Sequence, residues 1–166
     1  MLAPRDTFCF SAAAGWLELG NVAEAEAELS QLSPQAALDP DVLELKWLVC
    51  AEQAKWQEGL KAAQKLMEVA PNRPTGWLHS AYALRRLPDG SLQEAWEALL
   101  PAHRKFPRES LIPYNLSCYA CQMGDMEEAR KWLRKAVDCD GIEAIRKIAL
   151  ADKDLEPLWD EIRKMG

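Results

Sequence analysis

Two cysteines and two histidines are the residues of this sequence whose chemistry could be catalytic or metal-binding. Cys118 and Cys121 are separated by two residues, so on a helix they share one face and could bind a metal ion or cycle between dithiol and disulfide. A structural zinc site needs about four ligands, and the sequence has no second C-x-x-C and no H-x-x-x-H. A thioredoxin-like motif needs a strand before its first cysteine, whereas this pair lies inside a helical pattern. We therefore interpret Cys118 and Cys121 as packing residues.

The histidines and acidic residues give no catalytic arrangement either. His79 and His103 are lone side chains on predicted helices, with no Ser/Asp or Cys/Asn partner at a recognisable spacing. The acidic residues that lie close to one another in sequence are on amphipathic helices whose polar sides we expect in solvent. These residues are Glu24, Glu26, Glu28, Glu127 and Glu128. General acid–base catalysis needs a desolvated cleft that shifts pKa values, and a solvated helix face offers none. We therefore expect a protein that is not an enzyme and that has no cofactor and no metal site.

The composition favours a folded protein without a broad anionic partner. Apolar residues make up 49% and charged residues 28% of the 166, a balance that excludes disorder. The formal net charge of −6 argues against nucleic acid or an anionic membrane surface as partner. The sequence shows no apolar run of about 18 residues and no signal peptide at its start. Together with five cysteines read as reduced thiols, these features predict a cytoplasmic protein.

The elements that must position any site come from an internal repeat. Similar segments begin at Gly20, Ala54, Gly90 and Gly124, at spacings of 34, 36 and 34 residues. The two extra residues of the third unit fit the turn signal at 87–90. Within a unit, apolar residues recur at the spacing of an amphipathic helix, and no alternating strand pattern of useful length occurs.

The repeat unit reads as helix, turn, helix. Pro71 and Pro107 close the second and third units, because a helix must stop there. The expected helices span 5–19, 22–32, 41–53, 56–69, 74–86, 91–105, 110–122, 125–138, 141–150 and 155–164. For the last of them, Asp152 or Asp154 is the expected cap, and Pro157 is tolerated in its first turn.

Two stretches carry a resemblance to a known family. The segment Tyr114-Asn115-Leu116, followed by Gly124-Asp125-Met126-Glu127-Glu128-Ala129, closely resembles the consensus of tetratricopeptide repeats, as found in bacterial-type members of that family. The third unit matches the same pattern at Trp77, Ala81, Ala95, Leu99 and Pro107. The sequence departs from the pattern at Lys46, Trp47, Gly59 and Pro113.

The resemblance covers about residues 6–140 and implies an all-α fold. It implies a right-handed superhelical solenoid of about four helix pairs within one domain over 1–166. The expected repeats are 6–39, 40–73, 74–109 and 110–140, with capping helices at 141–166. A cap is expected because a solenoid otherwise exposes an apolar face at its end.

Similarity to the family also implies that the first helix of each pair lines a concave binding groove. The residues that we expect to face this groove are Phe10, Glu44, Leu48, Leu78, Tyr82, Arg85, Arg86, Tyr114, Asn115 and Cys118. Arg binds carboxylates in a bidentate manner, and Tyr and Arg are enriched at binding hot spots. We therefore hypothesise that a partner's carboxylate lies near Arg85 and Arg86, with its basic part toward Glu44 and Glu52.

The predicted function is that of an adaptor or scaffold that binds a protein or peptide. The heat-shock chaperone clamp known in the family is rejected, because Glu44, Leu48 and Tyr82 do not supply the required donors. Two alternatives stay open: a secretion-type chaperone that holds a hydrophobic client, and a self-association module that forms a homo-oligomer. The identity of the partner does not follow from the sequence.

Overall fold

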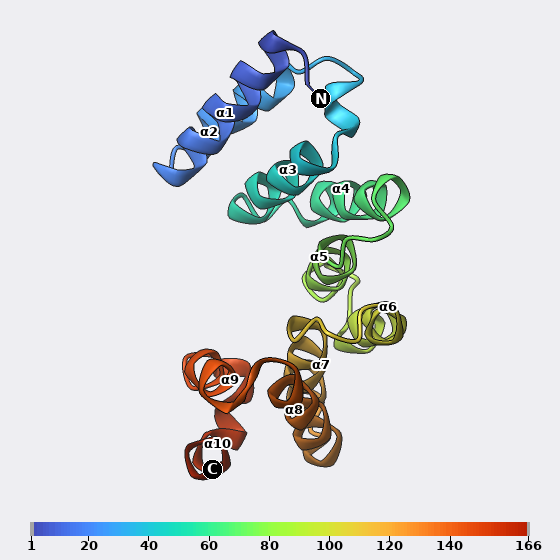
Figure 1. Cartoon of the computed structure of the whole chain (residues 1–166), viewed down its shortest axis with the longest axis vertical. Helices are drawn as coiled ribbons and strands as arrows, with labels where there is room; N and C mark the ends of the chain where they lie inside the picture. The colour runs from blue at the N-terminus through green and yellow to red at the C-terminus, as the bar shows by residue number, and fades with distance from the viewer. Residues whose placement is uncertain (1, 166) are drawn as a thin grey trace. The chain divides into compact units, whose positions relative to one another are not determined.

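The structure is a computed structural model that describes residues 2–165, and this part of the chain is helical with no strand (Figure 1). The all-α prediction is thus confirmed. The helices group into two compact units, one up to Leu87 and one from Pro88 onward. The expectation of a single domain over 1–166 stays a prediction.

The first unit consists of two helix pairs and the first helix of a third. Its elements are α1 (Pro4–Glu18), α2 (Val22–Ser30), a 3₁₀ turn η1 (Ala36–Leu38), α3 (Pro40–Glu52), α4 (Trp56–Val69) and α5 (Thr75–Leu84). Consecutive helices pack on one another, α1 on α2, α3 on α4 and α4 on α5. Small side chains at the crossings allow this close packing, since Ala13, Ala25, Ala63 and Ala81 are fully buried.

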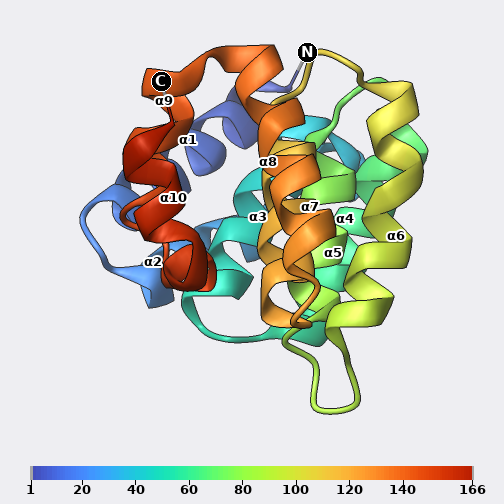
Figure 2. The ribbon, with the colours of Figure 1, turned by 90° about the horizontal axis from the view of Figure 1, so that it is seen from below.

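The second unit continues the pattern and ends in a short folded segment. Its elements are α6 (Leu92–Lys105), α7 (Leu111–Gln122), α8 (Met126–Asp140), α9 (Ile142–Ala149), a 3₁₀ helix η2 (Lys153–Leu158) and α10 (Trp159–Lys164). Helices α7 and α8 form a helix pair, and both views of the ribbon place them side by side (Figures 1 and 2). The segment η2 packs on α7, so the unit is closed by the end of the chain.

The turns inside the helix pairs follow the sequence pattern. Gly20 and Gly124 have φ values of 75° and 85°, in the left-handed region that favours glycine. The next residue then caps the second helix: Asn21 accepts a hydrogen bond from the Glu24 N–H, and Asp125 accepts one from the Glu128 N–H. In the second pair the same conformation falls on Ala54, with φ of 55°. The weaker repeat therefore carries a strained alanine where the others carry glycine.

The helix boundaries agree with the predicted ones to within about two residues at each end, the usual uncertainty of such boundaries. Two features differ. The connection between the first two pairs contains the 3₁₀ turn η1, which was not predicted. The last predicted helix, 155–164, is a 3₁₀ helix followed by a short α-helix, because Pro157 has no N–H to donate and lies within the 3₁₀ part. Asp152 caps this segment through the Asp154 N–H, as expected.

Candidate functional site

Helices α3 and α5 are held together by a ring stack and a hydrogen bond. The indole of Trp47 on α3 lies on the imidazole of His79 on α5, with ring centroids 3.8 Å apart and planes 6° from parallel. Close by, the Thr75 hydroxyl donates to the Glu44 carboxylate over 2.6 Å. The first helices of the second and third pairs therefore present their side chains on one shared surface, here called the α3–α5 face.

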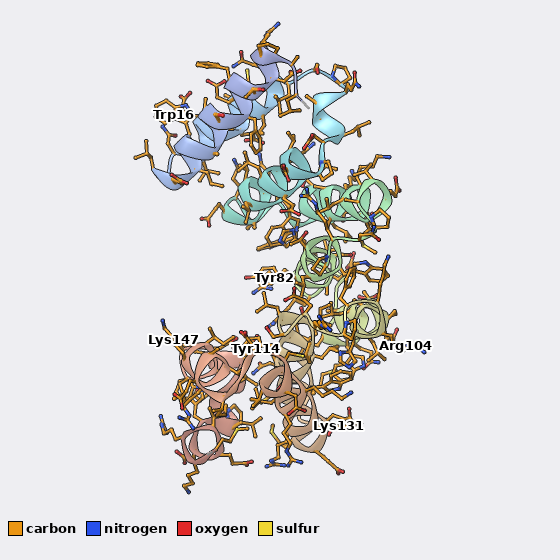
Figure 3. The ribbon with its side chains drawn as sticks, in the orientation of Figure 1. Trp16, Tyr82, Arg104, Tyr114, Lys131 and Lys147 are labelled. Atoms are coloured by element: carbon orange, nitrogen blue, oxygen red, sulfur yellow. The ribbon has the colours of Figure 1, made fainter. Side chains whose placement is uncertain are left out.

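A cluster of aromatic rings and one arginine lies on this face. The Tyr82 ring meets the Trp47 ring edge-on, with centroids 5.6 Å apart, and the Trp56 ring at 5.9 Å. The Arg86 guanidinium lies 3.4 Å from the centroid of the Tyr82 ring and 5.4 Å from that of Trp56. Tyr82 is labelled in Figure 3. Cation–π contacts of this kind hold the guanidinium in place against the rings.

Two departures from the family pattern explain how this cluster is built. Trp47 stands where the pattern has a small residue, and Gly59 stands where it has alanine. A Cβ at Gly59 would lie 3.6 Å from the Trp47 ring, so the indole packs directly against the backbone of α4. The large ring on α3 and the missing side chain on α4 therefore compensate each other.

The rings on this face are uncharged near neutral pH. Burial lowers the pKa of His79 to about 4, and the nearby Glu44 opposes this effect only in part. Among the residues described, Nδ1 of His79 and Nε1 of Trp47 have no hydrogen-bond partner. His79 therefore acts as a flat, neutral packing surface and not as a general acid or base at pH 7.

One of the acidic residues predicted near the groove, Glu44, is engaged within the protein, together with its neighbour Asp41. Arg73 donates to Asp41 over 2.6 Å and to Glu44 over 3.3 Å. The sequence reasoning did not identify Arg73, although an acidic pair at i and i+3 on α3 indicates a need for a cation. Leu48, one turn further along α3 from Glu44, is 44% exposed. The exposed surface of α3 thus includes an apolar side chain.

The remaining predicted residues of the first unit lie partly at the surface. Phe10 on α1 and Leu78 on α5 are half-buried, as are Arg85 and Arg86 at the end of α5. Arg86 also donates to the Tyr82 carbonyl. The structure therefore brings Tyr82 and Arg86 together, with the Tyr82 ring against Trp47, whereas Glu44 contacts Arg73 and Thr75.

The predicted residues of the fourth pair have a different environment. Tyr114 and Cys118 on α7 are buried under the C-terminal segment, toward which Tyr114 points in Figure 3. The Tyr114 hydroxyl donates to the Asp152 carboxylate over 2.9 Å, and the Cys118 thiol lies 3.6 Å from the same oxygen. Asn115 is half-exposed and donates to the Leu111 carbonyl. The C-terminal segment therefore occupies the part of α7 that was expected to face a partner.

The Cys118 environment also bears on the C-x-x-C pair. Burial, together with the charges of Asp152 and Asp154, raises the pKa of the Cys118 thiol well above its ordinary range. Burial likewise raises the pKa of Cys121. All five cysteines are free, and no group of three or more metal-ligating side chains occurs among residues 2–165. A protonated, buried thiol pair supports the reading of packing residues.

The chain resembles known proteins in its fold but not detectably in its sequence. No family model matches the chain, and no curated protein matches its sequence. TTC0263, a thermophilic TPR protein from Thermus thermophilus, superimposes with a TM-score of 0.71 at 17% identity, over 95% of this chain and 82% of its own. Residues 41 to the end of MamA from Desulfovibrio magneticus RS-1 give 0.71 at 16% identity, over 99% and 94%. This chain has the tetratricopeptide-repeat fold.

A third match concerns a protein described as a TPR protein with an unusual peptide-binding site. This protein, YrrB, superimposes with a TM-score of 0.65 at 18% identity, over 81% of this chain and 69% of its own. At such identities the likeness extends to the fold and not to individual residues. None of the TPR helices described here is long and apolar enough to cross a membrane.

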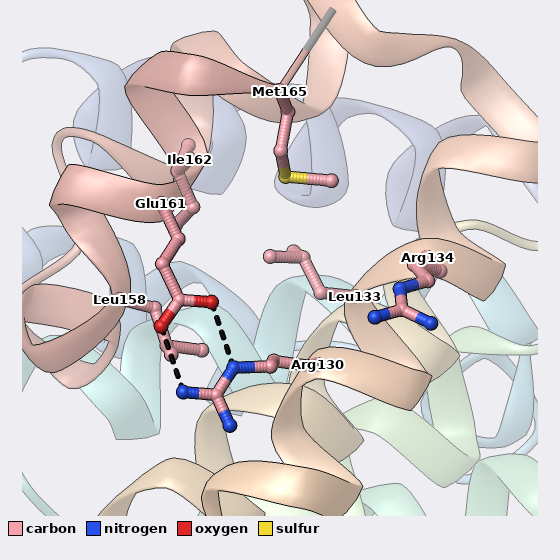
Figure 4. A pocket seen from close by; sticks show the side chains of 7 residues that line it. All are labelled: Arg130, Leu133, Arg134, Leu158, Glu161, Ile162 and Met165. Carbon is pink, nitrogen blue, oxygen red and sulfur yellow. Dashed lines mark hydrogen bonds and ion pairs between the residues drawn. The ribbon is translucent and has the colours of Figure 1, made fainter.

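Two hollows in the described part of this chain are small for a small-molecule site, and a third falls within the usual size range. A cavity of about 90 Å³ lies between α8 and α10, where the Arg130 guanidinium donates twice to Glu161 at 2.7 Å (Figure 4). A second hollow, of about 210 Å³, lies between α2 and α3 beside Cys50. Both are smaller than the roughly 300–1,000 Å³ typical of ligand pockets. A third, of about 500 Å³, lies beside Asp6 and Ser33, which already bond to each other.

Proposed function

We propose that this TPR chain is a protein-interaction module, with no catalytic activity of its own, that binds a peptide or protein segment on the α3–α5 face. The observation that carries the proposal is the ordered set of Trp47, Trp56, Tyr82 and Arg86, together with an exposed apolar side chain, Leu48, on α3. Trp, Tyr and Arg are the residue types that dominate binding energy at interfaces. Because their positions are fixed by packing before any partner arrives, little entropy is lost on binding.

The chemistry of the face favours a particular kind of segment. Arg86 favours a carboxylate on the partner, because guanidinium groups recognise carboxylates. Leu48 and the Tyr82 ring favour an apolar or aromatic side chain beside that carboxylate. The basic part once expected near Glu44 is not included in the proposal, because Arg73 already neutralises that carboxylate.

The fold neighbours support this class of function without identifying a partner. YrrB is described as having a peptide-binding site, and it shares the TPR fold. On our proposal the same general use applies to this chain, whereas the residues involved are its own. The buried Tyr114 and Cys118 are left out of the proposed face, because a partner would first have to displace the C-terminal segment.

A displayed library of random peptides tests the proposal even while the natural partner is unidentified. Peptides selected on the wild-type chain are expected to carry a carboxylate and an apolar residue, and to bind with dissociation constants that fluorescence polarisation can measure. Arg86→Ala and Leu48→Ala are each expected to weaken binding by about 5- to 30-fold, which corresponds to about 1–2 kcal/mol.

Lys135→Ala is the matched control, because Lys135 also lies over an aromatic ring, 3.9 Å from the Trp132 centroid, but on α8. It is expected to leave peptide binding unchanged. If Arg86→Ala binds as well as the wild type, or if Lys135→Ala is equally impaired, the α3–α5 face is not the binding site.

A further inference from the structure

Helix α1 exposes a row of large apolar side chains. Phe8 is 71% exposed, Trp16 37% and Leu19 77%. Ala12 and Gly15 lie between them, so the positions 8, 12, 15 and 19 follow one another at spacings of 4, 3 and 4. On a helix this spacing places all four on a single face. We call Phe8, Ala12, Gly15, Trp16 and Leu19 the outer face of α1.

The packing of α1 inside the protein uses the opposite side of the helix. The buried residues of α1 are Asp6, Cys9 and Ala13, and this side packs on α2. Figure 3 shows Trp16 on the side of α1 that faces away from α3. A helix that is apolar on both sides is typical of a protein interior, where both sides are covered. Within the first unit, Phe8, Trp16 and Leu19 of this face are exposed.

Gly15 is a second, independent observation on the same face. It lies in the interior of a fifteen-residue helix, a position that disfavours glycine. A Cβ added there would meet nothing within 4 Å, so packing inside the chain does not require a glycine. A second helix that approaches closely at this point would require one.

We propose that the outer face of α1 binds the same face of a second copy of this chain, with the two helices antiparallel. The 4-3-4 spacing is that of alternating core positions in a coiled coil, and antiparallel helices pair these positions across the seam. With the two-fold axis between Ala12 and Gly15, Phe8 lies opposite Leu19 of the second copy. Ala12 then lies opposite Gly15 of the second copy. Each contact occurs twice, as a closed two-fold interface demands.

The sizes of the paired side chains fit this arrangement. The two small residues in the middle bring the helix axes close together, and Phe8 and Leu19 fill the space at both ends. Trp16 flanks the seam beside the small central layers. The face is thus complementary to itself.

The exposed area indicates how strong the association is. With about 150–250 Å² for a large side chain, the three exposed residues provide on the order of 300 Å² of apolar surface per copy. A standard interface buries about 800 Å² per partner, so this seam with its flanks lies at the small end of the range. We therefore expect a dimer that dissociates on dilution into the micromolar range, and not an obligate one.

Sedimentation equilibrium of the wild-type chain and three variants tests the proposal. Between about 1 and 300 µM, the wild-type mass is expected to rise from that of one chain toward twice that value. Leu19→Glu places a charge in the seam and is expected to raise the dissociation constant at least tenfold. Leu38→Glu is the matched control, because Leu38 is 48% exposed and lies outside the outer face of α1. It is expected to associate like the wild type.

Gly15→Leu distinguishes a closely packed helix–helix interface from nonspecific hydrophobic association. The open space around Gly15 lets the single chain accept the larger residue, as an unchanged circular dichroism spectrum would show. In the proposed seam the leucine keeps the helices apart, so dimerisation is expected to weaken at least tenfold although the face becomes more apolar. A wild-type chain that stays a single chain up to about 300 µM overturns the proposal. Stronger association of Gly15→Leu, or equal impairment of Leu38→Glu, overturns it as well.

Discussion

Helices α1 and α7 are both the first helix of a pair, yet they differ sharply in how much of their surface is covered. Helix α7 buries nine of its twelve residues, whereas α1 buries three of its fifteen. Both helices are rich in apolar residues, so the difference does not come from their composition. It comes from their neighbours: α7 packs on α6, on α8 and on the η2 segment that follows α8, whereas α1 packs mainly on α2.

The cover over α7 combines apolar packing with polar anchoring. Leu155, Leu158 and Ile162 are almost completely buried, and Asp152 receives the Tyr114 hydroxyl. Gln122 at the end of α7 donates to the Asp154 carbonyl over 2.9 Å. A helix pair at the end of a repeat array needs such a cover, because its apolar side otherwise faces water. In α1, by contrast, Phe8 and Leu19 remain largely exposed.

Truncation of one buried leucine provides the largest expected contrast between the two regions. Leu158→Ala in the cover of α7 is expected to lower the free energy of unfolding by about 2–5 kcal/mol, because it leaves a cavity. Leu19→Ala on α1 is expected to change the free energy of unfolding by less than about 0.5 kcal/mol, since this side chain is in solvent. Urea unfolding followed by circular dichroism, at a concentration low enough to avoid association, measures both. Equal losses in the two variants would mean that α7 is not better sealed than α1.

The sequence predicts helices α1 and α7 themselves, but not which of them is covered by another segment. Periodicity, Gly20, Gly124 and the prolines at 71 and 107 define the helix pairs, because these are local signals. The predicted site treats the first helices of all pairs alike, so it includes both Tyr82 and Tyr114. The burial of Tyr114 depends on Asp152, 38 residues further along the chain, and local patterns carry no such information.

Contacts between neighbouring helix pairs could not be predicted from local sequence patterns either. Glu44 was expected to face a partner, but Arg73, 29 residues away, reaches it within the protein. Tyr82 and Arg86 were identified from their residue types, whereas the stack of Trp47 on His79 that supports them was not. The exposed row on α1 was present in the sequence as Phe8, Trp16 and Leu19. It was not predicted as a binding surface, because the resemblance to the family implies that the other side of that helix binds partners.

Removal of the Tyr114 hydroxyl is expected to have an intermediate effect on the free energy of unfolding, and it tests how the cover of α7 is held. Tyr114→Phe takes away the donor to Asp152 and leaves this carboxylate with the weaker Cys118 thiol, at a cost of about 1–2 kcal/mol in the free energy of unfolding. Tyr82→Phe is the matched control on the more open α3–α5 face, with an expected change below about 0.5 kcal/mol. Chemical denaturation of both variants measures the difference. A Tyr114→Phe variant as stable as the wild type would show that the cover of α7 is held by its leucines alone.

The smallest expected effect concerns the polar anchor of α1. Asp6 accepts hydrogen bonds from the backbone N–H and the hydroxyl of Ser33, both at 2.8 Å, and thereby ties α1 to the connection that leads into α3. These two bonds lower the pKa of the Asp6 carboxyl below its ordinary value. The charged form is therefore the one that the folded state favours. The resulting stability is present above the ordinary Asp pKa of about 3.9 and is lost as the pH falls toward the lowered value.

Asp6→Asn keeps the shape of the side chain and removes its charge. Its urea midpoint is expected to lie below that of the wild type at about pH 7, and the two midpoints are expected to converge as the pH falls below about 4. Glu18→Gln, an exposed change on the same helix, controls for the loss of one negative charge and is expected to show no such convergence. A gap between wild type and Asp6→Asn that stays constant over this range would mean that the Ser33 bonds do not depend on the carboxylate charge. In that case the neutral carboxyl would anchor α1 as well as the charged one, and the contrast with the cover of α7 would not depend on pH.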